Sequence, residues 1–130
     1  MKTKMNYDWS DKRVLIVDDT YLNCLLLKTI LEHTKIDITI ARNSKDFFHH
    51  IVNKFDLVLM DINLGENING IDLIKHMQTH GDDTPIIIQT AYGNEYFISD
   101  DIDYIDMIRK PINAQKLYVM MNAVLNGIIL

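Results

Sequence analysis

Short apolar runs alternate with longer amphipathic stretches five times along the chain. This pattern is typical of a parallel β-sheet with helices packed on both faces, because each strand of such a sheet buries both of its sides. The runs predict strands at about residues 12–17, 36–40, 55–60, 86–90 and 104–108. We therefore expect an α/β fold, although several three-layer folds share this pattern.

Apolar residues at helical spacing predict the elements between these strands. The first helix, from about Tyr21 to His33, is indicated by residues that recur every three or four positions: Leu22, Leu25, Leu26, Thr29 and Ile30. Asn43 or Ser44 can cap a second helix, since short polar side chains accept hydrogen bonds from the first turn. That helix is expected to turn its apolar residues inward: Phe47, Phe48 and Ile51.

Two of the remaining three helices are clearly marked in the sequence. One follows Asn69-Gly70, has an apolar side made of Ile71, Ile74 and Met77, and ends at Gly81. The last helix is indicated by apolar residues at helical spacing: Leu117, Met120, Val124 and Leu125. Between them, residues 93–101 are poorly amphipathic, and we predict a short helix there. The prediction is thus five strands and five helices.

Composition narrows the class of protein. A chain of 130 residues with 48% hydrophobic and 24% charged residues is expected to form one globular domain. The net charge of −5 argues against direct nucleic-acid binding, which needs a basic surface. Cys24 is the only cysteine, so an internal disulfide is impossible, and its apolar neighbours predict a packed thiol. No apolar stretch approaches the ~20 residues that span a bilayer, so we expect a cytoplasmic protein without membrane contact.

Charged and hydroxyl side chains stand where the predicted strands end. Asp18 and Asp19 follow the first strand, Asp61 follows the third, Thr90 closes the fourth, and Lys110 follows the fifth. The carboxyl ends of parallel strands meet at one edge of a sheet, where ligands bind, so these side chains should converge. Crowded carboxylates repel one another, which favours a bound divalent cation. The ammonium and the hydroxyl would then suit an incoming phosphoryl group.

The order and spacing of these pieces resemble the receiver domain of bacterial two-component response regulators. The resemblance rests on five segments: Val14–Asp19, Leu59–Asp61, Gly70, Thr90-Ala91 and Lys110-Pro111. It covers about residues 12–125, so we expect residues 1–130 to form a single receiver domain with that core. It implies a flavodoxin-like, doubly wound sheet with the strand order 2-1-3-4-5, which is a fold the family exemplifies.

The resemblance also implies a role for each residue at the strand ends. Asp61 would be the phosphoacceptor, attacking the phosphorus of a phosphohistidine to form an acyl phosphate. Lys110 would pair with one phosphoryl oxygen, and Thr90 would hydrogen-bond another and act as part of a switch. Mg²⁺ would be held by oxygen donors from four residues: Asp18, Asp19, Asp61 and, through its backbone carbonyl, Asn63.

Three further positions bear on the switch and on the lifetime of the acyl phosphate. The family has a cis peptide before the proline that matches Pro111, which helps to aim Lys110. It usually has Tyr or Phe three residues before the lysine, as an aromatic switch, whereas this chain has Met107. The flexible Met107 side chain can fill the same gap. Tyr92 is predicted to shield the acyl phosphate and slow its hydrolysis.

The resemblance implies a sensor histidine kinase or a histidine phosphotransfer protein as partner, docking along the first helix. A homodimer is also possible. Three segments are similar to receivers at the C-termini of hybrid sensor kinases: Asp8–Arg13, Asn23 and Gln89–Tyr92. A stand-alone receiver is the alternative setting.

Two functions from other classes stay open. The chain could be an interaction module that works without phosphorylation, because Met107 departs from the usual switch. It could also be a Mg²⁺-dependent phosphatase that uses a strand-end aspartate. That chemistry needs a second aspartate two residues later as general acid, and Asn63 stands there instead. We therefore expect a protein that catalyses only its own phosphorylation and dephosphorylation.

Overall fold

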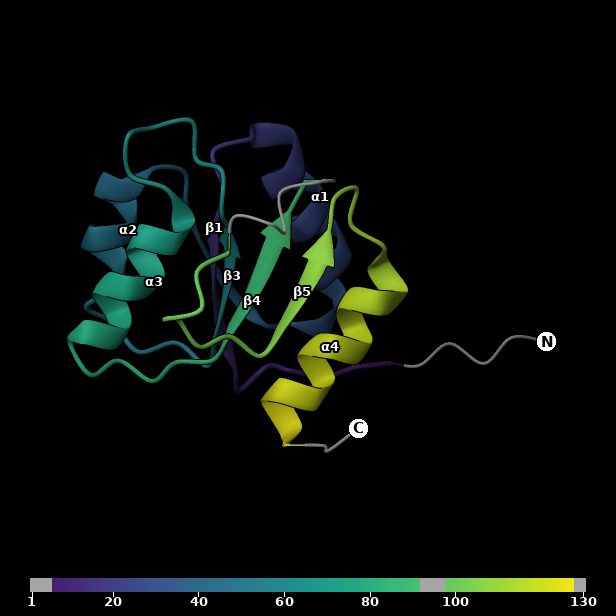
Figure 1. Cartoon of the computed structure of the whole chain (residues 1–130). Coiled ribbons are helices and arrows are strands. Elements are labelled where there is room, and N and C mark those ends of the chain that lie inside the picture. The colour runs from purple at the N-terminus through teal and green to yellow at the C-terminus, as the bar shows by residue number, and fades with distance from the viewer. Residues whose placement is uncertain (1–5, 92–97, 128–130) are drawn as a thin grey trace.

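Five parallel strands form one sheet at the centre of the molecule (Figure 1). The computed structural model describes residues 6–91 and 98–127. The strands are β1 (Arg13–Val17), β2 (Asp37–Ala41), β3 (Leu57–Asp61), β4 (Ile86–Thr90) and β5 (Asp106–Arg109). They lie side by side in the order β2-β1-β3-β4-β5, so the predicted fold class and strand order are confirmed.

The strands read as continuous apolar runs because the sheet is covered on both faces. All five residues of β3 and all five of β4 are buried, whereas the edge strand β2 has one fully buried residue. The register pairs Val17 with Met60 and Asp61 with Gln89, so β1, β3 and β4 end at nearly the same level. Residues that follow these strands therefore start from one edge of the sheet.

Helices cover the two faces in pairs (Figure 1). Helices α1 (Tyr21–Leu31) and α4 (Ala114–Asn126) lie on one face, and α2 (Ser44–His50) and α3 (Gly70–Thr79) on the other. A short 3-10 helix, Glu32–Thr34, extends α1. Among the described residues, none of these helices has the length and apolar content needed to cross a bilayer.

The helix predicted over residues 93–101 is not supported by the part that the structure describes. Ile98 and Ser99 have no regular structure, and Asp100 and Asp101 form a turn. Residues 93–97 lie outside the described residues, as does Tyr92. In the described part, the Ser99 hydroxyl donates to the carboxylate of Asp101, a local contact typical of a turn.

Helix α1 forms as predicted, but the leucines that indicated it lie on its outer side. Leu22, Leu25 and Leu26 are 72%, 47% and 39% exposed. The buried side is made of four other residues: Cys24, Leu27, Ile30 and Leu31. Apolar residues lie on both sides of this helix, so helical spacing predicted the element without selecting its inner face. The prediction that Cys24 is packed is confirmed, since the residue is buried.

Asparagines begin three of the helices. The side chains of Asn43, Asn69 and Asn113 each accept a hydrogen bond from a backbone N–H in the first turn of α2, α3 and α4. Within α2, Phe47 is fully buried, but Phe48 is 38% exposed. The prediction that Phe48 turns inward is therefore wrong, because consecutive helical residues point about 100° apart and this short helix buries only one side.

Candidate functional site

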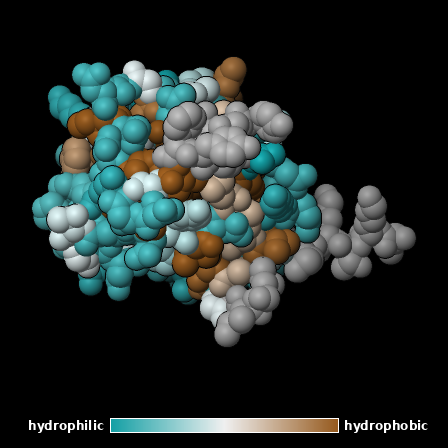
Figure 2. Space-filling model, in the orientation of Figure 1, coloured by the Kyte–Doolittle hydropathy of each residue, from teal (hydrophilic) through white to brown (hydrophobic). Residues whose placement is uncertain are grey.

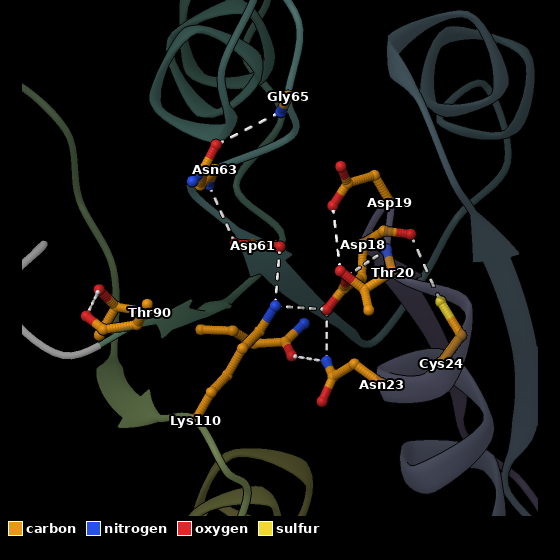
Figure 3. Close-up of polar contacts among 12 residues, drawn as sticks. Asp18, Asp19, Thr20, Asn23, Cys24, Asp61, Asn63, Gly65, Thr90 and Lys110 are labelled. Carbon is orange, nitrogen blue, oxygen red and sulfur yellow. Dashed lines mark hydrogen bonds and ion pairs between the residues drawn. The ribbon is translucent and has the colours of Figure 1, made fainter.

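The five predicted site residues come from four strand ends at the carboxyl edge of the sheet. Asp18 and Asp19 follow β1, Asp61 ends β3, Thr90 ends β4 and Lys110 follows β5. Figure 3 shows Asp18, Asp61 and Lys110 directed toward one another, with Asp19 beside Asp18 and with Thr90 on the opposite side of Lys110. The parallel topology thus brings together side chains that are far apart in sequence.

Three carboxylates form the acidic part of the site. One oxygen from each of Asp18, Asp19 and Asp61 lies within 4.8 Å of the other two. Asp18 is fully buried, Asp61 is 3% exposed, and Asp19 is partly exposed. Such a group of oxygen donors, open to solvent on one side, fits a hard divalent cation that keeps some of its water ligands.

Lys110 is ion-paired with two of these carboxylates. Its Nζ lies 2.8 Å from Oδ2 of Asp61 and 2.9 Å from Oδ2 of Asp18. The backbone N–H of Lys110 donates to the Thr90 carbonyl at 2.8 Å, which fixes where the side chain starts. The peptide bond between Lys110 and Pro111 is cis, the form that the family resemblance implied.

The charges at the site are unbalanced. Among the described residues, Lys110 is the one cation ion-paired with any of the three carboxylates, and it contacts only Asp18 and Asp61, which leaves a formal charge of −3 + 1 = −2. Burial raises the pKa of Asp61, and nearby Asp18 adds to the rise, although hydrogen bonds from Lys110 and from the Asn63 backbone oppose it. Burial works against the charged form of Lys110, yet its bonds to Asp61 and Asp18 hold its pKa above the ordinary value. A divalent cation would cancel the remaining charge.

Thr90 is fully buried at the end of β4. Its hydroxyl donates to the carbonyl of Ala91 at 3.0 Å, and its own backbone carbonyl accepts from the Lys110 N–H. Met107, in the place of the family's aromatic residue, is partly buried against the apolar cluster under α2 and α3. Met107 pairs in register with Ile88. Of the two predicted switch residues, Thr90 is thus linked to Lys110 by a backbone hydrogen bond, and Met107 packs in the apolar cluster.

Asn63 lies two residues beyond the end of β3. Its backbone N–H donates to Oδ1 of Asp61 at 3.0 Å, and its side-chain oxygen accepts from the Gly65 N–H at 3.3 Å. These two bonds hold the start of the loop against Asp61 (Figure 3). The use of the Asn63 carbonyl as a metal ligand stays a prediction.

Two glycines allow the backbone to approach the site closely. Gly70, the first residue of α3, has its Cα so near β3 that a Cβ would lie 2.1 Å from the Asp61 carbonyl oxygen. Gly65 has a φ of +66°, and a Cβ there would lie 3.0 Å from Oδ2 of Asp19. Gly70 was among the motif residues. Gly65 was predicted only as a turn residue of the polar loop Asn63–Gly70, and its close approach to Asp19 was not predicted.

Asn23 and Gln89 entered the sequence analysis only through the similarity to hybrid-kinase receivers, and no part in the site was predicted for them. Their side chains form hydrogen bonds beside Asp18. The available signal was Gln89 itself, a polar residue inside an otherwise apolar run.

Comparison with known proteins agrees with the fold. The response regulator receiver domain family matches residues 14–122, and the chain belongs to this family. The family is, in general, a signalling module. Relatives include hybrid signal transduction histidine kinase I of Dictyostelium discoideum, which is 34% identical over 125 residues. The transcriptional regulatory protein CpxR of Escherichia coli is 31% identical over 116 residues.

These relatives are longer proteins. The chain aligns over 85% of its own length with the hybrid kinase but covers only 7% of that protein; for CpxR the shares are 87% and 49%. Among solved structures, a CheY-like receiver domain protein from Methanospirillum hungatei is 28% identical, with a TM-score of 0.80. That alignment covers 89% of this chain and 94% of the other.

Proposed function

We propose that this chain is a phosphoacceptor in a cytoplasmic two-component phosphorelay, in which Asp61 receives a phosphoryl group from a phosphohistidine in the presence of Mg²⁺. The observation that carries the proposal is the cluster of Asp18, Asp19 and Asp61 with Lys110 on one sheet edge. Membership of the receiver family supports it independently.

The residues present fit a magnesium ion. Asp18, Asp19 and Asp61 would hold it, with the Asn63 carbonyl as a fourth candidate ligand, and its charge matches the formal −2 of the site. When bound, Mg²⁺ supplies positive charge to phosphoryl oxygens, where a loose transition state needs it. Asp18 and Asp61 are buried, so their carboxylates are already placed before the ion arrives.

The other residues of the site have simple tasks in the transfer. A carboxylate oxygen of Asp61 forms a bond to phosphorus while the P–N bond of the phosphohistidine breaks, and the imidazole keeps the electron pair of that bond. Lys110 already touches Oδ2 of Asp61, so its ammonium is placed to pair with an oxygen of the transferred group. Thr90, at the adjacent strand end, would donate its hydroxyl to another phosphoryl oxygen after leaving the Ala91 carbonyl.

Exposed apolar residues near the site support docking of a histidine kinase or a histidine phosphotransfer protein along α1. Leu22 and Leu25 stand on the outer side of this helix, and Tyr21 at its start is 60% exposed. Helix α1 begins two residues after Asp19, so a partner bound there would hold its phosphohistidine near Asp61. Apolar side chains on a solvent-facing helix are a common element of protein interfaces.

A second apolar area lies over the β5–α4 side (Figure 2). Ile105, just before β5, is 60% exposed, and Val119 of α4 is 41% exposed. We propose that this side responds to phosphorylation, because β5 leads directly to Lys110, and that it is the candidate surface for a homodimer.

The test of the proposed function is phosphorylation in solution. The protein is incubated with a small-molecule phosphodonor, with and without Mg²⁺, and its intact mass is measured, with Asp61→Asn as the matched control. We expect the mass of one added phosphoryl group only in the wild type with Mg²⁺. An unmodified wild type would overturn the proposal and favour the interaction module. Sustained turnover of a generic phosphomonoester would instead favour the phosphatase.

A further inference from the structure

Gln89 is a fully buried polar residue in the middle of the sheet. It is the fourth residue of β4 and the register partner of Asp61 on β3. Strand side chains alternate between faces, so Gln89 points to the same face as Ile87, which belongs to the core under α1 and α4. A buried amide without hydrogen-bond partners destabilises the folded state by about 1–3 kcal/mol, so the stability of the sheet depends on the partners of Gln89.

The partners of Gln89 define a chain of hydrogen bonds. Its Nε2 donates to the backbone carbonyl of Leu59 at 3.4 Å, which leaves its Oε1 as an acceptor. That oxygen accepts from Nδ2 of Asn23 at 2.9 Å. Nδ2 of Asn23 also donates to Oδ2 of Asp18. The chemistry fixes these orientations, because the ionised Asp18 can only accept and the Asn23 amide has two hydrogens to donate.

Both oxygens of Asp18 are therefore held by the protein. Oδ1 accepts from the backbone N–H of Thr20 at 2.8 Å, while Oδ2 is shared between Asn23 and Lys110. Of these donors, the Lys110 ammonium is the one that the phosphoryl group would attract away. The Asn23 amide would stay bonded to Asp18, because its second hydrogen bond, to Oε1 of Gln89, fixes its position.

We propose that Asn23 and Gln89 are positioning residues for the magnesium site, acting through Asp18. Asn23 keeps the Asp18 carboxylate directed at the site when Lys110 moves to the phosphoryl group, and Gln89 fixes the direction of the Asn23 amide. The inference rests on the proposed function. Outer partners of metal ligands typically change metal affinity by 10- to 100-fold when they are removed.

The test measures Mg²⁺ affinity rather than phosphorylation. The midpoint of thermal unfolding is followed against Mg²⁺ concentration for the whole chain, because a ligand of the folded state raises the midpoint according to its dissociation constant. For Asn23→Ala we expect the dissociation constant to rise about tenfold. For Gln89→Leu we expect a smaller rise. The double variant should bind no more weakly than Asn23→Ala alone, because Gln89 acts through Asn23.

A matched control separates positioning from general stability. Thr34→Val removes a buried hydroxyl that donates to a backbone carbonyl, in the short 3-10 helix that follows α1 at its end remote from the site, and should lower stability without changing Mg²⁺ affinity. Asn23→Ser serves as a second variant if Asn23→Ala fails to fold, and should also weaken binding.

The outcomes distinguish this inference from the function on which it rests. If Mg²⁺ does not raise the midpoint of the wild type, the proposed metal site is wrong, and this inference falls with it. If the wild type binds but both single variants keep its affinity within twofold, positioning by Asn23 and Gln89 is refuted. Fully additive losses in the double variant would also refute it, because they would mean that the two residues act independently.

Discussion

Replacing Gly70 with alanine tests how tightly α3 packs against the end of β3. The added Cβ would lie 2.1 Å from the Asp61 carbonyl oxygen and 2.8 Å from the Cα of Ile62. Both neighbours are backbone atoms, which cannot rotate away as a side chain can. The nearest contact is 0.9 Å shorter than the 3.0 Å below which real Cβ atoms are essentially not found, so α3 or β3 must move.

The expected loss follows from that displacement. Overpacking of a dense interior typically costs about 1–3 kcal/mol, and we expect the upper end because the clashing atoms belong to the backbone of Asp61 and Ile62. For a domain of this size, ~3 kcal/mol corresponds to a fall in the unfolding midpoint of roughly 12 °C. Since the atom displaced first belongs to Asp61, the stabilisation by Mg²⁺ should also shrink.

Thermal and urea unfolding, with and without Mg²⁺, measure both effects. Gly81→Ala is the matched control, because Gly81 has a φ of +79° but no atom within 4 Å of the added Cβ. That variant should lose only the cost of the left-handed backbone, about 1 kcal/mol, and should keep its response to Mg²⁺. The reasoning about close approach is refuted if Gly70→Ala is no less stable than Gly81→Ala.

Three further predictions concern a charge, a thiol and a helix cap. Lys110→Met leaves two buried carboxylates without their cation, so the free energy of unfolding without metal should fall by about 2 kcal/mol at neutral pH. Denaturant titration should show this loss shrinking in acid, as Asp61 takes up a proton, and an unchanged stability at pH 7 would contradict the ion pairs. Burial, reinforced by the Asp18 charge, raises the pKa of the Cys24 thiol from 9.0 to about 11. The folded state keeps this proton at pH values where the unfolded state loses it, so stability should fall between about pH 9 and 11, and less so in Cys24→Ser; equal slopes would argue against a buried neutral thiol. Asn69→Ala removes the reciprocal cap of α3 and should cost about 1 kcal/mol in urea unfolding, more than Asn122→Ala on the exposed side of α4.

Much of the fold could be predicted from the sequence because parallel strands buried on both sides leave a strong signal. The strand predicted near residues 104–108 is displaced to Asp106–Arg109, since it lies at the sheet edge and is apolar on one side only. In contrast, α1 has leucines on both sides, and nothing local distinguishes the leucines that pack from those that face solvent.

The predictable part of the site was its group of carboxylates, because acidic residues directly follow the apolar strands in the sequence. The convergence of Asp18, Asp19 and Asp61 follows from topology, and the resemblance to receivers supplied the rest. The contact of Asn23 with Gln89 could not be predicted, because it joins residues 66 positions apart and depends on the rotation of α1 over the sheet. The close approach of Gly65 to Asp19 could not be predicted either, because it depends on the path of the loop after β3.

The strand order divides the site between the middle and the margin of the sheet. The carboxylates come from β1 and β3, each of which has a neighbouring strand on both sides, whereas Lys110 follows β5, which pairs with β4 alone. A small tilt of this outermost strand would carry the ammonium with it and leave the acids undisturbed. The cation of the site is therefore attached to the strand with fewer lateral contacts, and the carboxylates to strands that are paired on both sides.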